Sequence, residues 1–257
     1  IGMRSHSIRY RAQLMRAKRK GFFAGTSWLK LLRLLPSPTA AWPVEDFAEP
    51  VQEDSAAGLM QFNSPMGRFW APSSDRGPLG STIIEMLSSV YEYGDAVIKH
   101  GDLVFDLGAN LGTFSRLAFA KGAAKVVAFE AQAVYQRCLQ RTFSREITQG
   151  TFELICSPVW SRRTTVRFTG RSMVGHVAAD GEEDGVTMES VTLDQVVDAL
   201  RLPGVDFLKA DIEGAERHAL EGASGLMRRF RPRGAFCVYH LPDDPEVIGG
   251  FLKRVQP

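Results

Sequence analysis

Residues 103–112 read Leu103-Val104-Phe105-Asp106-Leu107-Gly108-Ala109-Asn110-Leu111-Gly112, and this run sets the architecture expected for the chain. Its apolar start predicts a short buried strand, and the following residues, 113–121, have the spacing of a helix. Gly108 allows the backbone to turn tightly and approach a ligand, and Gly112 allows helix and strand to pack closely. We therefore expect a strand–turn–helix unit that binds a ligand at its turn.

Strands and helices continue to alternate after this unit. Further strands are predicted at 125–129, 152–156, 164–168, 205–210 and 235–239, and helices at 81–99, 134–147, 193–200, 215–230 and 246–255. This order predicts an α/β fold with a doubly wound, mostly parallel sheet. We expect one domain over 81–257, a loop at 169–186, and a basic, Pro-rich extension over 1–80 that is helical or irregular.

The predicted turn favours a ligand without phosphates. A pyrophosphate fingerprint has three glycines, but here Asn110 stands near the place of the middle one, and the acidic Asp106 is a poor neighbour for phosphate. Glu130 ends the second strand 22 residues after Gly108, which is the spacing of an acid that binds ribose hydroxyls. A cationic aminoacyl group with a ribose fits both features, and S-adenosylmethionine is such a ligand.

Polar side chains also follow the later strands. Asp211 and Glu213 come after the fourth strand, and His240 comes after the fifth. Ligands of open parallel sheets bind at the carboxyl ends of the strands, so we expect Asp211 and His240 to converge near the reactive methyl. Glu216 falls in the first turn of the next helix, where an acid is favoured by the helix dipole, and we expect it to act as a cap.

Four segments together resemble the FkbM-type methyltransferases: 101–112, Val127-Ala128-Phe129-Glu130, Val191-Thr192-Leu193-Asp194 and 205–216. The resemblance covers about residues 85–255. It implies a class I methyltransferase fold and S-adenosylmethionine-dependent O-methylation of a hydroxyl on a sugar or secondary-metabolite-like small molecule. Where the family commonly has Pro after the strand-two Glu, this chain has Ala131. The antiparallel hairpin that usually ends the fold is expected to be missing, as in a fragment.

The resemblance and the strand ends together give a set of candidate site residues. The expected cofactor-binding residues are Asp106, Gly108, Asn110, Gly112, Glu130 and Asp211. For catalysis, His240 is the first candidate for the base that takes the hydroxyl proton, followed by Asp211, with Glu213 beside them. A divalent cation held by Asp211, Glu213 and Asp243 or Asp244 is an alternative, but we expect no metal.

Three further expectations concern residues around the site and the thiols. The 169–186 loop, with Arg171, Ser172 and His176, is either a substrate lid or a surface loop. Tyr91 and Tyr93 either cover the cofactor or belong to the core. The three cysteines are expected to be reduced and buried, because their spacing fits neither a zinc site nor a disulfide framework.

Charge is distributed unevenly along the chain. Residues 1–35 contain no acid and nine basic residues: Arg4, Arg9, Arg11, Arg16, Lys18, Arg19, Lys20, Lys30 and Arg33. Such a segment is a solvated tail, an arm that folds back, or a surface for a membrane or nucleic acid. The apolar run 22–35 is too short to span a membrane. We expect a cytoplasmic protein with a small-molecule acceptor, no nucleic-acid partner, and a homodimer if a sheet edge stays uncovered.

Three competing functions remain at this point. A dinucleotide-dependent oxidoreductase is disfavoured because the middle glycine is absent. A nucleic-acid methyltransferase would explain the basic segment, yet the chain lacks an Asn-Pro-Pro-Tyr or Asp-Pro-Pro-Tyr run after the fourth strand. A non-catalytic cofactor-binding module is favoured if the terminal strands are absent.

Overall fold

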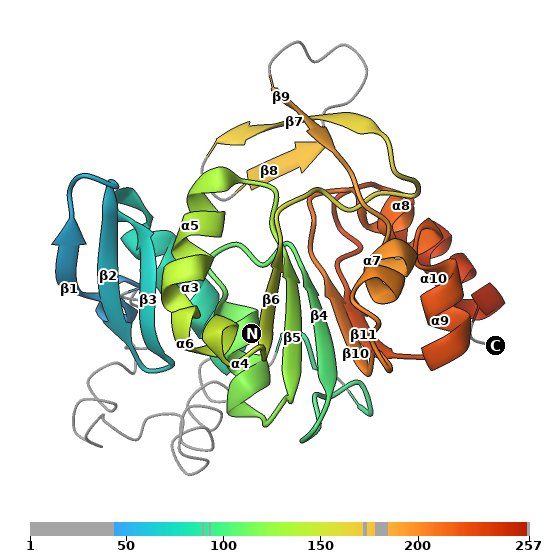
Figure 1. Ribbon diagram of the computed structural model, residues 1–257, viewed down its shortest axis with the longest axis horizontal. Coiled ribbons are helices and arrows are strands. Elements are labelled where there is room, and N and C mark those ends of the chain that lie inside the picture. Colours follow the sequence, from blue (N-terminus) through green and yellow to red (C-terminus); the bar gives the residue numbers. More distant parts are fainter. Residues whose placement is uncertain (1–43, 89, 93, 172–173, 178–184, 256–257) are drawn as a thin grey trace, which may run out of the picture.

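The computed structural model describes residues 44–255 except 89, 93, 172–173 and 178–184, and Figure 1 shows its arrangement. A five-stranded parallel sheet forms its centre, in the order β11-β10-β4-β5-β6. These strands are β4 (Leu103–Leu107), β5 (Lys125–Phe129), β6 (Phe152–Ile155), β10 (Phe207–Ala210) and β11 (Arg233–Phe236). The predicted α/β class and the parallel sheet are thus confirmed, and the fourth and fifth predicted strands are neighbours.

Alternate residues of the central strands belong to two separate hydrophobic clusters, one on each face of the sheet. Val104 and Val126 pack with α3 (Arg76–Leu87), α4 (Thr113–Ala120) and α5 (Ala133–Thr142), beside which lies α6 (Ser144–Thr148). Phe105 and Val127 pack instead with α7 (Leu193–Ala199), α8 (Glu216–Glu221), α9 (Ser224–Phe230) and α10 (Asp244–Val255). A strand with apolar side chains on both faces must be covered by helices on both faces, as observed.

The segment expected to be irregular contains an antiparallel sheet, so that part of the prediction is wrong. β1 (Glu49–Asp54), β2 (Leu59–Ser64) and β3 (Gly67–Pro72) pair in the order β1-β2-β3, between the short helices η1 (Val44–Phe47) and η2 (Ser73–Asp75). The prolines occupy places that tolerate them: Pro50 lies at a register shift in the edge strand β1, Pro65 in the turn, and Pro72 at the end of β3. The basic segment 1–35 lies outside the described residues.

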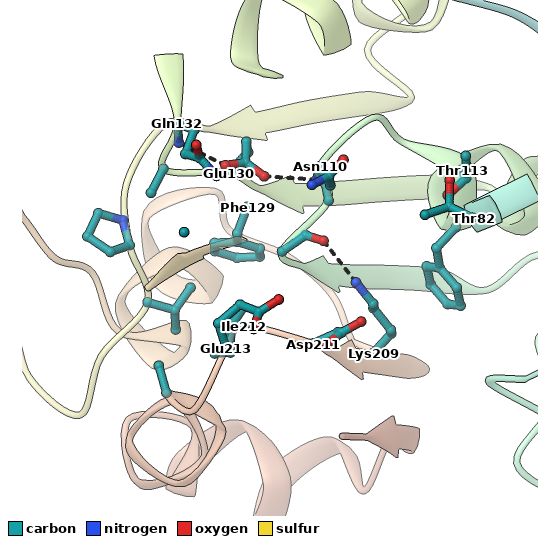
Figure 2. Close-up of a pocket in the computed structure, with 18 of the residues that line it drawn as sticks. Thr82, Asn110, Thr113, Phe129, Glu130, Gln132, Lys209, Asp211, Ile212 and Glu213 are labelled. Carbon is teal, nitrogen blue, oxygen red and sulfur yellow. Dashed lines mark hydrogen bonds between the residues drawn. The ribbon is translucent and has the colours of Figure 1, made fainter. Parts of the chain in front are cut away.

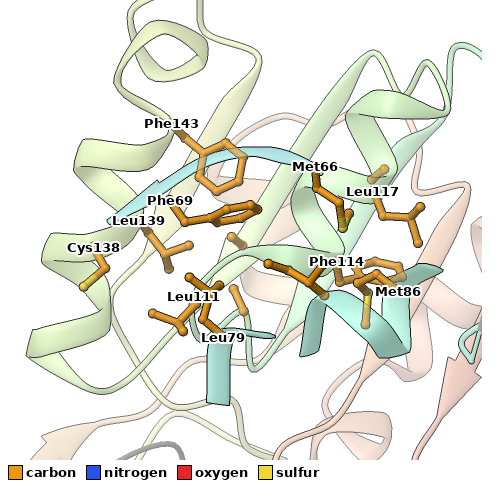
Figure 3. Packing of buried hydrophobic residues seen from close by; sticks show 14 of the residues in the cluster. Met66, Phe69, Leu79, Met86, Leu111, Phe114, Leu117, Cys138, Leu139 and Phe143 are labelled. Carbon is orange, nitrogen blue, oxygen red and sulfur yellow. The ribbon is translucent and has the colours of Figure 1, made fainter. Parts of the chain in front are cut away.

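This N-terminal sheet packs against α5. Phe69 belongs to the same hydrophobic cluster as Leu139 and Phe143, and Figure 3 shows these side chains together. The Trp70 backbone N–H donates to Thr142 Oγ1 at 2.9 Å, and the Arg141 guanidinium lies 4.9 Å from the centre of the Trp70 ring. One hydrophobic core therefore contains residues from both sides of residue 80, where the boundary between the extension and the domain was expected.

A third sheet, in the order β8-β7-β9, lies beyond the carboxyl ends of the central strands (Figure 1). Its strands are β7 (Thr165–Arg171), β8 (Val174–Val177) and β9 (Val186–Glu189). The 169–186 segment was expected to be a loop, which is wrong for β8 and for the end of β7. The glycine- and acid-rich composition hid a local hairpin, in which Phe168 pairs with Val177 and Arg171 with Val174.

Several boundaries also differ from prediction. The helix expected at 81–99 is α3, which ends at Leu87, and that expected at 134–147 is divided at Phe143 into α5 and α6. The helix expected at 215–230 is divided into α8 and α9 near Gly222, whose added Cβ would lie 2.3 Å from the Trp160 carbonyl oxygen. β11 ends at Phe236, so His240 follows a loop and not the strand itself.

The thiols differ from prediction in one case. Cys138 and Cys237 are free and buried, and burial raises the pKa of each thiol to about 12. Cys156 is free but exposed, because it follows β6 at the surface. None of the three forms a disulfide within the described structure.

Candidate functional site

A cavity of about 250 Å³ lies at the carboxyl ends of the central strands. Its walls come from the turn after β4, the end of β5, the turn after β10, and the third sheet. Figure 2 shows Asn110, Glu130 and Asp211 at this cavity. This is the place at which open parallel sheets bind ligands.

Gly108 is required where the β4 turn meets the β10 turn. It adopts φ +75°, and an added Cβ would lie 2.0 Å from the Asp211 carbonyl oxygen. The N–H groups of Gly108 and Ala109 both donate to the Phe129 carbonyl oxygen at 3.0 Å, which fixes the turn against β5. Asn110 then adopts φ +51°, and all three turn residues line the cavity.

Gly112 has a different role from the one expected. It adopts φ +82°, and its added Cβ would lie 2.4 Å from the Phe143 ring and 2.8 Å from Leu139. The close approach is therefore between the start of α4 and the α5 region, not between helix and strand. Gly112 does not line the cavity. It allows the turn to pack closely against Phe143 and Leu139, which do not line the cavity either.

Glu130 lines the cavity with a carboxylate that the backbone holds in place. Its side chain is almost buried (7% exposed), and its two oxygens accept the backbone N–H groups of Asn110 and Gln132, each at 2.8 Å (Figure 2). Burial raises its pKa, against which the two N–H groups act. Each carboxylate oxygen has a second lone pair, so the group can still accept hydrogen bonds from a diol.

Asp106 lies beneath the turn instead of facing the cavity. Its exposed fraction is 0%, Ser115 Oγ donates to it at 2.7 Å, and Lys209 Nζ lies 3.2 Å from its Oδ1. The expected direct contact with a cationic ligand is thus not available in this arrangement. Asp106 lies within β4, and its carboxylate is already occupied by Ser115 and Lys209.

Lys209 was not among the predicted residues, although it occupies a central place. It lies in β10, lines the cavity, and donates to the carbonyl oxygens of Leu107 and Gly108 at 3.1 and 2.9 Å. Burial lowers its pKa, but Asp106 and Asp211 outweigh burial and raise the pKa overall. A lysine within the apolar run 207–210 was the signal that could have found it, since a buried charge needs partners.

Asp211 lines the cavity and accepts from two tyrosines. Tyr91 Oη donates to Oδ2 at 2.6 Å, and Tyr239 Oη donates to Oδ1 at 3.3 Å. Burial raises the pKa of Asp211, but the Lys209 charge and the Tyr91 hydrogen bond outweigh it and lower the pKa overall. Tyr91 lines the cavity and packs on the core ring of Phe114, as the core alternative expects, and its covering of the cofactor stays a prediction, whereas Tyr93 lies outside the described residues.

His240 lies close to Asp211, as predicted. It does not itself line the cavity, but lies behind Asp211 and Glu213, which do. Its Nε2 lies 3.8 Å from Asp211 Oδ1 and 3.4 Å from Glu213 Oε2. Glu213 itself lines the cavity and adopts φ +54°. A ligand therefore meets the two carboxylates before it meets the imidazole, although His240 was the first candidate for the base.

Glu216 was expected to act as a cap. That expectation is wrong: the N-cap of α8 is Ala215, and the oxygens of Glu216 accept the N–H groups of Ile212 and Gly214 at 2.8 and 3.0 Å, so Glu216 fixes the turn before the helix instead of capping it. In addition, its Oε1 lies 3.1 Å from Nδ1 of His240. The cap expectation did not foresee this second contact, because His240 lies 24 residues further along the chain.

The cation alternative loses two of its proposed participants. Asp243 and Asp244 pair with the guanidinium of Arg217, at 2.7 and 2.6 Å, away from Asp211. Asp211, Glu216 and His240 do offer atoms within 4.8 Å of one another. Both oxygens of Glu216 already hold backbone N–H groups, however, and we identify none of the three as a metal ligand.

The third sheet covers the side of the cavity near Gln132. Phe168, Gly175 and Val177 line the cavity, and an added Cβ at Gly175 would lie 2.5 Å from Gln132 Nε2. Of the residues named for a lid, Arg171 ends β7, His176 lies in β8, and Ser172 is outside the described residues. On the opposite side, α3 contributes Thr82, Glu85 and Met86.

The comparisons with known proteins agree with this geometry. The family model described as "Methyltransferase FkbM domain" matches residues 106–252, and the chain belongs to that family. The match thus identifies a methyltransferase domain, and its fold is the α/β fold described above. No curated protein matches the chain significantly.

Two solved structures are similar at low identity. Methyltransferase FkbM from Methylobacillus flagellatus KT is 15% identical with a TM-score of 0.48, covering 73% of this chain and 50% of that one. A proposed RNA methyltransferase from Pyrococcus horikoshii is 19% identical with a TM-score of 0.32, covering 57% of this chain and 54% of that one. The chain thus spans about half the length of either structure.

The residues present fit S-adenosylmethionine. Gly108 leaves room for close approach to the turn, and Glu130 presents a buried carboxylate of the kind that binds a ribose diol. The carboxylates of Asp211 and Glu213, which line another part of the cavity, suit the positive charge of a sulfonium. Among the described residues, no helix is long and apolar enough to cross a membrane.

Proposed function

We propose that this methyltransferase transfers the methyl group of S-adenosylmethionine to a hydroxyl of a sugar or secondary-metabolite-like small molecule. The observation that carries the proposal is the arrangement of Asp211 and Glu213 in the cavity wall with His240 Nε2 behind them. A hydroxyl must lose its proton when it attacks a methyl carbon, so a group that accepts the proton is needed. An amine acceptor has less need of such a group.

In this proposal Glu130 binds the ribose, and Gly108 to Asn110 form the floor under the cofactor. S-adenosylmethionine supplies an electrophilic methyl group on a good leaving group, so positioning provides much of the rate. Asp211 and Glu213 accept a hydrogen bond from the acceptor hydroxyl and orient it. The proton then passes to His240 Nε2, which is 3.4 Å from Glu213 Oε2.

The proposal is tested by incubating the full chain with methyl-labelled S-adenosylmethionine and a panel of saccharides and hydroxylated metabolites. Each acceptor is matched with an analogue in which an amino group replaces the hydroxyl. We expect label on hydroxyl oxygen. Label that appears only on nitrogen, or a chain that binds nicotinamide dinucleotide but not S-adenosylhomocysteine, would overturn the proposal.

His240→Ala gives a sharper test of the proton acceptor. Because His240 lies behind the wall, we expect the substitution to leave the dissociation constant of S-adenosylhomocysteine unchanged and to lower kcat by about 100-fold or more. Calorimetry measures binding, and label transfer measures kcat. His218→Ala is the matched control, since that histidine is 37% exposed on α8 and should alter neither quantity. Full turnover by His240→Ala would remove His240 from the mechanism.

A further inference from the structure

Glu216 is more tightly enclosed than a helix cap requires. Its side chain is fully buried, with an exposed fraction of 0%, although a glutamate is seldom buried without partners. Oε1 accepts the N–H of Ile212 and Oε2 accepts the N–H of Gly214. Since both oxygens are held by backbone groups, the carboxylate cannot rotate away from its neighbours.

The neighbour that remains is His240. Glu216 Oε1 lies 3.1 Å from Nδ1, on one side of the imidazole, while Nε2 on the other side faces Glu213 and Asp211. The Tyr239 ring packs beside the imidazole with a centroid separation of 4.3 Å. The charged groups around His240 are thus three carboxylates, and Lys209 is the cation that interacts with the most distant of them, Asp211.

We propose that Glu216 is a positioning residue that keeps a proton on Nδ1 of His240 and so directs Nε2 to the carboxylates of the cavity wall. A neutral imidazole carries one N–H, and the surroundings of its two nitrogens decide which of them is free. Nδ1 makes no hydrogen bond in the described structure, but the buried, fixed carboxylate 3.1 Å away favours the N–H on that nitrogen through its charge. The role of His240 in turnover rests on the proposed function, but the position of its proton does not.

A purely structural role for Glu216 predicts something different. If Glu216 served only to hold the N–H groups of Ile212 and Gly214, its loss would loosen the turn without selecting a tautomer of His240. The tautomer is therefore the decisive observable. In enzymes with a Ser–His–Asp triad, removal of the carboxylate that orients the histidine costs about 10⁴-fold in kcat through the wrong tautomer.

The test uses the full chain with ¹⁵N-labelled histidine and observes both ring nitrogens by NMR. The chain has five histidines, and the spectrum of His240→Asn identifies the signals of His240 by their loss. We expect Nδ1 to carry a proton in the neutral ring as well as in the charged ring. A neutral ring with its proton on Nε2 would overturn the proposal, whether or not any acceptor is methylated.

Glu216→Gln and its control complete the test. The amide removes the negative charge beside Nδ1, so we expect the preference for a proton on Nδ1 to weaken and the population of neutral rings with the proton on Nε2 to rise. We also expect kcat for a hydroxyl acceptor found by the panel to fall at least about tenfold, with S-adenosylhomocysteine bound as before. Glu221→Gln removes the same charge from the same helix at a side chain that is 60% exposed, and it should change nothing.

The outcomes separate the two proposals. An unchanged tautomer and an unchanged kcat in Glu216→Gln would overturn the positioning role. If the panel shows no transfer to any hydroxyl, the O-methylation proposal fails, and the tautomer of the wild-type chain still decides the role of Glu216. If Glu216→Gln does not fold, that same wild-type spectrum decides it.

Discussion

The two halves of the cavity hold their carboxylates in different ways. In the cofactor half, residues 108–110 and 129–132, Glu130 is held by backbone N–H groups of Asn110 and Gln132. In the acid half, residues 211–216 with His240, Asp211 is held by the side chain of Tyr91, and Glu213 faces the imidazole of His240. The cavity-lining carboxylate of the first half is thus held by backbone groups, and those of the second half contact side chains from other segments.

Lys209 connects the halves, so its loss should have the largest effect. Lys209→Met leaves the buried charge of Asp106 without its partner and frees the carbonyl oxygens of Leu107 and Gly108. We expect the free energy of unfolding to fall by about 3–5 kcal/mol, the usual cost of breaking a buried ion pair. Urea denaturation followed by circular dichroism measures it.

The double variant Asp106→Asn with Lys209→Met is the matched comparison. It removes both charges, so it should recover part of the lost free energy of unfolding. A loss below about 1 kcal/mol in Lys209→Met, typical of an exposed pair, would show that the two halves are independent.

Gly108→Ala tests the backbone contact between the halves. The added Cβ meets the Asp211 carbonyl oxygen, so overpacking of about 1–3 kcal/mol adds to the strain of a positive φ. Gly150→Ala is the control, because Gly150 adopts φ +71° with nothing within 4 Å of the added Cβ. Denaturation of both variants gives the loss in free energy of unfolding for each, and the difference is the contribution of the contact. Equal losses would mean that the two halves can shift apart without a cost in free energy.

Glu130→Ala should affect the cofactor half alone. Two lost hydrogen bonds to a charged group cost about 1.5–3 kcal/mol each before compensation by water, so we expect S-adenosylhomocysteine to bind at least about 100-fold more weakly. Calorimetric titration measures this. Glu153→Ala, on β6 outside the cavity wall, is the control. Unaltered affinity in Glu130→Ala would place the ribose elsewhere.

The same contrast explains what could be predicted from sequence. Gly108 and Glu130 follow from local turn geometry and strand spacing, and both line the cavity. Lys209 and the second role of Glu216 depend on partners about 100 and 24 residues away, at Asp106 and His240, which no local pattern reports. His240 was placed near Asp211 correctly, but the loop after β11 sets it behind the wall.

The N-terminal sheet was missed for a related reason. Its prolines resemble those of an irregular connector, and they are tolerated only because they occupy an edge strand, a turn and a strand end. The contact of this sheet with α5 includes the hydrogen bond between Trp70 and Thr142, which are 72 residues apart. Such a contact can be recognised only when the position of α5 relative to the sheet is known.

That sheet also decides how the protein can be divided for laboratory work. The family match begins at residue 106, whereas Phe62 and Phe69 of the N-terminal sheet share a core with Leu139 and Phe143. A recombinant protein cut to the matched segment would leave the apolar side of α5 in water, a surface that favours aggregation. The smallest unit suitable for expression therefore begins before β1, well upstream of the residues by which the family is recognised.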